Sequence, residues 1–393
     1  MTVAFRSRNG LVTIKIESSS GTDATPTPAS NAWKVREGWT WTPEFEVQET
    51  DEVRSSLDQS EPVIGRGMGR MEIPAFLKGA DTAGTAPEAG PGLRCCGLSE
   101  TLTASAVTGT ASAGATGSIT LGSYGSSTDS IYVGMVIGTT GGTGSGQLRV
   151  ISAYDGTSKV ATVVPNWTTP PDATTTFSIY ANALYVPIST GFETATVYGY
   201  DLHSDGSSDS RLRKLVGAAG SLQLSIGQSG ALPDLTFNLQ GQAVLPADVT
   251  KPDAGTFQAA AAKPFLGADV YLGGAALKVS AFSLDLGAEV AAFDDPSATY
   301  GFDTFSPTNR QVSGSFTADQ TLVSVRNTVS DFIGSTSRSL WLRWGTVAGQ
   351  RVSLWLPALR YTGNTMGDLR GYRTEQVPFR APTADGAFYL CIH

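Results

Sequence analysis

Residues with the chemistry for catalysis are few and widely spaced in this sequence. The 393-residue chain contains only two histidines, His203 in a polar segment and His393 at the last position. A Ser-His-Asp or Cys-His arrangement needs a histidine beside its nucleophile, so hydrolases of these types are disfavoured. P-loop, HExxH and paired CxxC motifs are also missing from the sequence. We therefore expect no catalytic residue, no cofactor and no metal site.

Carboxylate pairs are the remaining candidates for acid and base chemistry. Glu44 with Glu46, or Asp294 with Asp295, could in principle serve a glycosidase, which holds two carboxylates across one cleft. Neighbours one or two positions apart in the chain do not indicate a shared cleft, and a solvated strand face explains them better. The sequence favours a protein that is not an enzyme.

The cysteines and the apolar segments bear on the compartment. Cys95 and Cys96 are adjacent and Cys391 is third from the end, an odd count without metal-ligand spacing or a disulfide framework. This pattern predicts free thiols in a reducing cytoplasm. The first ten residues have no apolar signal core, and no stretch approaches the about 20 apolar residues of a membrane span. We expect assembly in a cytosol, or export inside a larger particle, with no membrane partner.

The composition favours many short strands over helices. Forty-five glycines stand beside 40% hydrophobic and only 16% charged residues. The net charge of −8 argues against a protein that grips phosphate backbones, because such binding needs clusters of Lys and Arg. An acidic wall repels DNA, which suits a passage through which DNA slides. The length predicts one large β domain with an insertion, or two domains.

The strongest strand signal lies at residues 217–242. Leu222, Leu224 and Ile226 alternate with polar residues, and after a Gly/Pro-bearing loop Leu235 and Phe237 resume the alternation. Period-two patterning on both sides of a loop predicts an antiparallel hairpin with one apolar face. A Pro/Asp-rich loop is expected next, at Pro246, Asp248, Lys251, Pro252 and Asp253.

Residues 104–187 differ in composition from the rest of the chain, which predicts an inserted domain. Alanine, glycine, serine and threonine dominate, and short apolar runs recur at regular spacing, which predicts a small β-barrel or sandwich. Residues 1–103 and 188–393 then form one discontinuous parent domain. The strands expected in the insertion are 118–121, 132–137, 147–154, 159–163 and 176–180.

One helix is expected, over residues 317–333. A capping-box pattern begins at Thr317, and Gly334 closes the segment. An apolar stripe at helical spacing predicts that the helix packs on the sheet. The stripe consists of Leu322, Val325, Val329, Phe332 and Ile333.

Several short segments of the sequence resemble, in the same order, segments of the major tail tube protein of long-tailed bacteriophages. The hairpin at 217–242 with its Pro/Asp loop is one such segment. An opening strand followed by residues 17–23 (ESSSGTD) is another, and Gly97-Leu98 ends a short apolar segment typical of the family. A further match in order and character runs through Tyr200, Asp201, His203, Arg213 and Gly217.

The resemblance covers residues 1–102 and 188 to about 380. It implies curved antiparallel sheets in a tail-tube-type β-sandwich with one packed helix, in a structural protein of the virion tail or of a related gene transfer particle. Six copies would close into a ring, and rings would stack into the tube that conducts the genome from capsid to host cell. Assembly would occur in the bacterial host cytoplasm. The implied partners are tail terminator, tape measure and distal tail proteins, with double-stranded DNA passing without specific binding.

Three groups of charged residues receive candidate roles. A strand near 44–48 presents an acidic, solvated face that would line the passage, and the long loop at 50–70 occupies the place of the family's ring-stacking loop. The last strand offers charges for pairs between subunits. The candidates are Glu44, Glu46 and Glu49 for the lumen, Asp51, Arg54, Asp58, Glu61 and Arg66 for contacts between rings, and Arg370, Arg373 and Glu375 for contacts between subunits.

The alternative hypothesis is a particle-borne or secreted adhesin that binds glycans through the inserted domain. In that case Trp167, Tyr154 and Tyr180 would be the stacking platforms for sugar rings.

Overall fold

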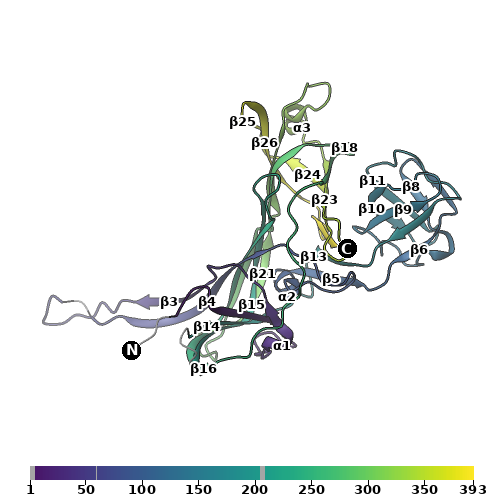
Figure 1. Ribbon diagram of the computed structural model, residues 1–393. Coiled ribbons are helices and arrows are strands. Elements are labelled where there is room, and N and C mark those ends of the chain that lie inside the picture. Colours follow the sequence, from purple (N-terminus) through teal and green to yellow (C-terminus); the bar gives the residue numbers. More distant parts are fainter. Residues whose placement is uncertain (1–4, 59, 204–208) are drawn as a thin grey trace.

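The chain is built almost entirely of antiparallel strands, as its composition predicts. The computed structural model describes residues 5–58, 60–203 and 209–393 (Figure 1). Within them the strands form one 18-stranded sheet, one seven-stranded sheet and one two-stranded sheet. The mainly-β fold class is therefore confirmed. The polar segment that contains His203 continues into residues 204–208, which lie outside the described residues.

The expected hairpin is confirmed and forms the spine of the large sheet. β15 (Asp209–Ile226) and β16 (Asp234–Thr250) pair antiparallel, with Leu222 opposite Phe237. The apolar residues of the alternation are buried, and Gln223 is exposed. The Pro/Asp loop begins later than expected, because Pro246 lies inside β16. Pro246 falls at a shift in register, where its missing N–H costs no ladder bond.

β15 exchanges neighbours halfway along its length. Its first part pairs with β14 (Ala195–Leu202), and its last four residues pair with β19 (Val279–Asp285). β16 pairs on its other side with β4 (Val63–Phe76). The outer strands on these three sides are β1 (Gly10–Ile16) and β2 (Ala32–Trp33) beyond β14, β3 (Thr40–Gln48) beyond β4, and β22 (Ser313–Asp319), β26 (Tyr372–Arg380) and β25 (Thr365–Leu369) beyond β19.

The remaining strands of the large sheet form a second layer that closes the core. β24 (Val352–Tyr361) connects the layers, because Tyr361 pairs with Phe379 of β26 while Leu354 pairs with β23. Side chains from both layers, including Phe316 and Leu340, join one buried cluster. The order of this layer is β5 (Leu98–Thr103), β13 (Asn182–Pro187), β27 (Tyr389–Ile392), β24, β23 (Arg338–Trp344), β17 (Asp269–Leu272) and β18 (Ala275–Ala276).

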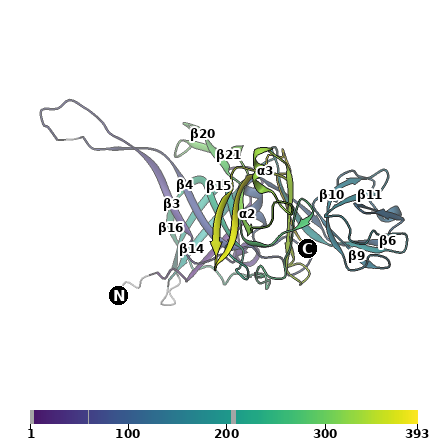
Figure 2. The same ribbon diagram turned by 90° about the horizontal axis from the view of Figure 1, so that it is seen from above.

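The seven-stranded sheet lies within the range expected for the insertion and has its own buried cluster, which includes Ile119, Ile137 and Phe177. It stands at one side of the molecule (Figures 1 and 2). Four expected strands overlap observed ones, but most of 132–137 is a turn before β9. β13 belongs to the large sheet although it falls inside 104–187. In order, the strands are β6 (Val107–Thr110), β12 (Thr176–Ile179), β9 (Val136–Gly141), β10 (Leu148–Asp155), β11 (Val160–Val164), β8 (Ser118–Thr120) and β7 (Ala113–Ala115).

The two-stranded sheet was not anticipated from the sequence. β20 (Ala288–Asp294) and β21 (Phe302–Arg310) form a hairpin whose Phe302 and Phe305 pack against Ala219 of β15. The aromatic and acidic residues of 293–303 lie at the end of β20, in the turn, and at the start of β21. The two strands are bent by two shifts in register, which break the period-two pattern.

The helix expected over 317–333 is wrong in its start and length. Residues 317–319 end β22, which pairs on both sides, so sheet pairing overrides the local capping signal. α3 (Thr328–Ile333) begins after Asn327, whose side chain accepts a hydrogen bond from the Ser330 N–H. Its apolar stripe is exposed and does not lie on the sheet. The other helices of the described residues are α1 (Pro28–Asn31), α2 (Gly90–Cys95) and the 3-10 turn Gly122–Tyr124.

A buried carboxylate connects the first loop to the spine. Glu17 accepts hydrogen bonds from the Gly21 N–H at 2.9 Å, the Gly217 N–H at 2.7 Å, and the hydroxyls of Thr194 and Thr196 at 2.7 Å each. Gly217 has φ +65°, and a Cβ there would lie 3.3 Å from the Gly21 Cα. The segment 17–23 therefore has a structural role in this chain, because it closes a bulge in β15.

Asp23 continues the same connection at a more exposed position. Its carboxylate accepts hydrogen bonds from the Tyr198 hydroxyl at 2.6 Å, the Lys214 ammonium at 3.0 Å and the Thr25 N–H at 2.9 Å. Burial alone would raise the pKa of Asp23, but these hydrogen bonds outweigh burial and hold the pKa below its ordinary value.

Replacing Phe237 with alanine tests the core. Phe237 is fully buried and meets Trp33 edge to face, with ring centroids 5.0 Å apart. We expect Phe237→Ala to lower the free energy of unfolding by about 3–5 kcal/mol, measured by urea denaturation. Phe293→Ala, at a position 71% exposed, is the matched control and should stay within about 0.5 kcal/mol of wild type. Equal effects would contradict this core.

Acid should weaken the Asp23 connection. Because the folded-state pKa lies below the unfolded-state value, the unfolded chain binds the proton first, and stability falls as the pH drops below about 4. We expect Asp23→Asn to show a smaller loss of stability between pH 7 and pH 3 than wild type, measured by denaturant midpoints at each pH. A loss as large as in wild type would show that Asp23 contributes nothing to it.

Candidate assembly surfaces

His393 and the three cysteine side chains are all buried. His393 is buried, and its pKa is lowered well below the usual value by burial and by the charges of Arg343 and Arg351. All three thiols are buried; burial raises the pKa of Cys96 well above its usual value and that of Cys391 to about 12. Thiols of this kind are inert, because the thiolate is the nucleophile.

The carboxylate pairs noted in the sequence do not share a cleft. Glu44 pairs with Arg70 at 2.7 Å, and Glu46 pairs with Arg66 at 2.8 Å. Asp295 accepts the Ser297 N–H in its own turn. No group of three or more metal-ligating side chains occurs among residues 5–58, 60–203 and 209–393.

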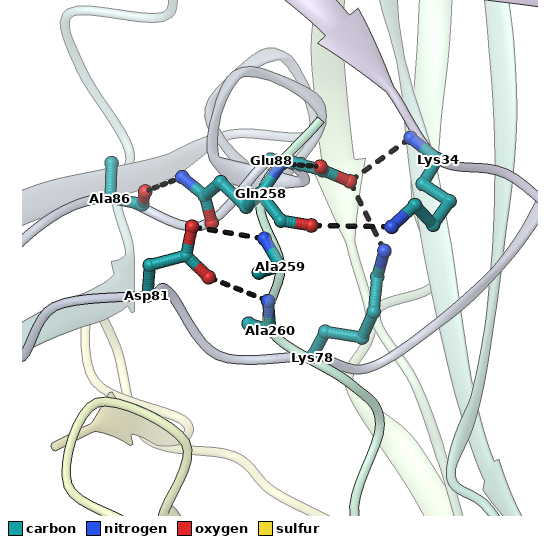
Figure 3. A network of polar contacts seen from close by, with 8 residues as sticks. All are labelled: Lys34, Lys78, Asp81, Ala86, Glu88, Gln258, Ala259 and Ala260. Atoms are coloured by element: carbon teal, nitrogen blue, oxygen red, sulfur yellow. Dashed lines mark hydrogen bonds and ion pairs between the residues drawn. The ribbon is translucent and has the colours of Figure 1, made fainter. Parts of the chain in front are cut away.

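The densest polar network near α2 is a structural clamp (Figure 3). Glu88 accepts hydrogen bonds from the N–H groups of Lys34 at 3.0 Å and Gln258 at 2.6 Å, and forms a largely buried ion pair with Lys78 at 3.1 Å. Asp81 accepts the N–H groups of Ala259 and Ala260. The network fixes the irregular segment that follows β16, and each of its carboxylates is paired.

The most prominent feature is an arm formed by the β3–β4 hairpin. The arm projects from the body on the side away from the inserted domain in both views (Figures 1 and 2). Its base is braced by Arg66, which pairs with Glu46 of β3 and, at 2.7 Å, with Asp294 of β20. Arg66 also lies over the ring of Phe302, 5.2 Å from its centroid.

The candidate lumen and ring-contact residues divide between the base and the end of the arm. Glu44, Glu46 and Arg66 lie at the base, where each carboxylate is neutralised by an arginine. The others lie in the segment 49–62, which we call the arm loop, and their side chains are exposed. They are Glu49, Asp51, Arg54, Asp58 and Glu61.

The arm also exposes apolar side chains that sequence reasoning did not select. Val53 and Leu57 in the arm loop are fully exposed. Val47, Val63 and Ile64 on the strands are between half and two thirds exposed. Val47 continues an alternation with Phe45, which normally indicates a core face, so its exposure could not be expected from the sequence pattern.

A second exposed surface lies where α3 meets the β25–β26 hairpin; we call residues 320–333 and 365–373 the tip surface. Figure 1 shows it at the top of the body. Arg370 occupies the turn of the hairpin with φ +55°, and Arg373 is exposed on β26. Glu375 is instead buried and accepts a hydrogen bond from the Thr328 hydroxyl at 2.9 Å. Glu375 thus holds α3 onto β26 inside the subunit.

The tip surface exposes nine large apolar side chains. The expected helix stripe accounts for most of them, and the hairpin adds three side chains. In exposed fraction they are Leu322 75%, Val323 70%, Val325 73%, Val329 51%, Phe332 39%, Ile333 79%, Met366 68%, Leu369 45% and Tyr372 78%.

The aromatic platform proposed for glycan binding is not available. Trp167 and Tyr154 are 2% and 4% exposed, so neither ring can stack on a sugar. Trp167 instead packs under Arg149, and Tyr180 lies against His393 and Arg351. The inserted domain therefore gives the adhesin hypothesis no stacking site at these residues.

No known protein family matches the chain, and no curated protein matches it either. In the described residues, no helix is both long and apolar enough to cross a membrane.

Removing the brace at the arm base should loosen the arm without unfolding the body. We expect Arg66→Ala to speed amide hydrogen exchange at residues 44–48 and 64–67, because both ion pairs of Arg66 are lost. The midpoint of global unfolding should not change, because exposed ion pairs contribute little. Arg54→Ala, in the arm loop, is the matched control. Unchanged exchange in Arg66→Ala would show that the arm holds its position without this brace.

Proposed function

We propose that the chain is a self-assembling structural subunit, and that it forms the tail tube of a long-tailed bacteriophage or of a related gene transfer particle. Hexameric rings stack into a tube that conducts double-stranded DNA from capsid to host cell. The observation that carries this proposal is the projecting arm, whose loop exposes Val53 and Leu57 fully to solvent. Exposed apolar side chains at the end of a projection are characteristic of a contact with another protein.

Open strand edges also support assembly. In the described residues β3 pairs only with β4, and β25 pairs only with β26. An unpaired edge is a template for strand pairing with another chain, and closure into a ring would remove it. Pro43 lies in β3, as is typical of an edge strand.

The charge of the chain supports a tube that DNA passes through more than it supports a protein that binds DNA. The net charge is −8, and the arginines of the arm base are already paired with carboxylates. A wall of this kind offers phosphates few free cations, so DNA passes without specific binding. Glu44 and Glu46 would contribute a neutralised wall, and Glu49 an acidic one. Tail terminator, tape measure and distal tail proteins would be the further partners, in a virion tail assembled in the bacterial host cytoplasm.

Negative-stain microscopy tests the proposal. We expect the purified protein to give rings or tubes of uniform bore. A sample that stays monomeric at high concentration by analytical ultracentrifugation would overturn it.

Shortening the arm should abolish assembly while leaving the fold intact. Gln48 pairs with Val63, so a two-residue Asn-Gly turn can replace residues 49–62. We expect this variant to keep the circular dichroism spectrum of wild type and to form no tubes, because the exposed arm loop is gone. Tyr124→Ala, at an exposed position of the inserted domain, is the control and should still assemble. Tubes formed by the short-arm variant would show that the arm loop isn't required.

A further inference from the structure

Two surfaces of this chain, the arm and the tip surface, expose large apolar side chains to solvent, and they lie at different ends of the molecule. The arm loop and its flanking strands expose five large apolar side chains, and the tip surface exposes nine. Soluble monomers rarely leave contiguous apolar patches of this kind open to water. Figure 1 shows the arm and α3 pointing in different directions, so the arm of one chain does not cover its own tip surface.

The two surfaces carry opposite charge. The segment 49–61 holds five carboxylates and one arginine, a net charge of −4. The exposed charged residues of the tip surface are Arg370 and Arg373 against Asp368, a net charge of +1. Among the described residues, neither Arg370 nor Arg373 forms an ion pair, whereas Asp331 and Asp319 are paired within the subunit. Both guanidinium groups are exposed at the tip, with Asp368 directly opposite Arg373 across the β25–β26 pair.

We infer that the tip surface is the docking site for the arm loop of a second copy of this chain. The inference rests on the proposed self-assembly and names the surface that the arm meets. Apolar side chains such as Leu57 pack among those of α3, and the carboxylates around Asp51 face Arg370 and Arg373. Opposite charges at the rim of an apolar contact steer and orient the two partners.

The contact joins two different surfaces, so it propagates. Each copy uses its arm on one neighbour and its tip surface on another, which is a heterologous contact that yields a closed ring or an open filament. The open edge of β25 lies within the tip surface and offers backbone groups to the incoming arm. Burial of the α3 stripe between copies also explains why that stripe is apolar although it does not lie on its own sheet.

Cysteine cross-linking between two variants tests the contact. All three native cysteines are buried, so introduced thiols react alone. We expect a mixture of Leu57→Cys and Ile333→Cys proteins to give a cross-linked dimer with a short bis-maleimide, while each variant alone gives at least tenfold less. Leu57→Cys mixed with Tyr124→Cys is the matched control, because Tyr124 is also exposed but lies on the inserted domain. Equal yields from both mixtures would overturn the inference.

Charge reversal tests orientation and separates this inference from the proposed function. Arg370→Glu with Arg373→Glu should abolish assembly in ultracentrifugation, and adding Asp51→Lys and Glu52→Lys should restore it. Arg211→Glu, at an exposed position on β15, should assemble like wild type. If wild type assembles but reversal has no effect or the second pair does not rescue, the docking site is wrong and the tube proposal stands. If wild type does not assemble, both fail.

Discussion

The backbone ladder between β15 and β16 is the interaction on which the rest of the structure depends. It runs from Asp209 opposite Thr250 to Ser225 opposite Asp234. β14, β19 and β4 pair with it directly, and the remaining strands of the large sheet attach through these three. The ladder is interrupted near Gly217, where a bulge leaves an N–H group that Glu17 accepts. Beyond this interruption β15 exchanges β14 for β19. The β15–β16 hairpin therefore pairs with two groups of strands along β15, one through β14 and one through β19. Along β16 it pairs with β4, which leads into the arm.

The carboxylates of this acidic chain mostly hold segments in place. Glu17 fixes the first loop to β15, Glu88 fixes the irregular segment after β16, and Glu375 fixes α3 to β26. In each case the group is largely buried and hydrogen-bonded, since a buried charge without partners would be costly. Five exposed carboxylates gather in the arm loop: Glu49, Asp51, Glu52, Asp58 and Glu61. With Arg54 they give this loop a net charge of −4, half of the −8 of the whole chain.

Patterns confined to a few neighbouring residues were predictable, and features that depend on distant residues were not. The alternation at 222–226 predicts its strand because one face is buried. The same kind of evidence failed at 317–333, since β22 is held by two partner strands far away in sequence and the apolar stripe after it has no core to meet. The ion pair of Glu46 with Arg66 and the hydrogen bond of Glu375 with Thr328 could not be predicted either. Each joins segments whose relative positions no local sequence pattern determines. Burial of Trp167 under Arg149 depends likewise on the fold of the whole insertion.

The way the inserted domain is attached has an evolutionary consequence. The chain leaves the parent sheet at Thr103 and returns at Asn182, and these two residues are direct partners between β5 and β13. Because Thr103 and Asn182 are adjacent, the strand pairing of the parent sheet does not depend on the length of the segment between them. A lineage can therefore gain, lose or exchange this module in a single recombination event. One contact restricts such an exchange. Val150 of the inserted domain packs on Trp341 and Trp355 of the large sheet, so a replacement domain must also cover these two rings.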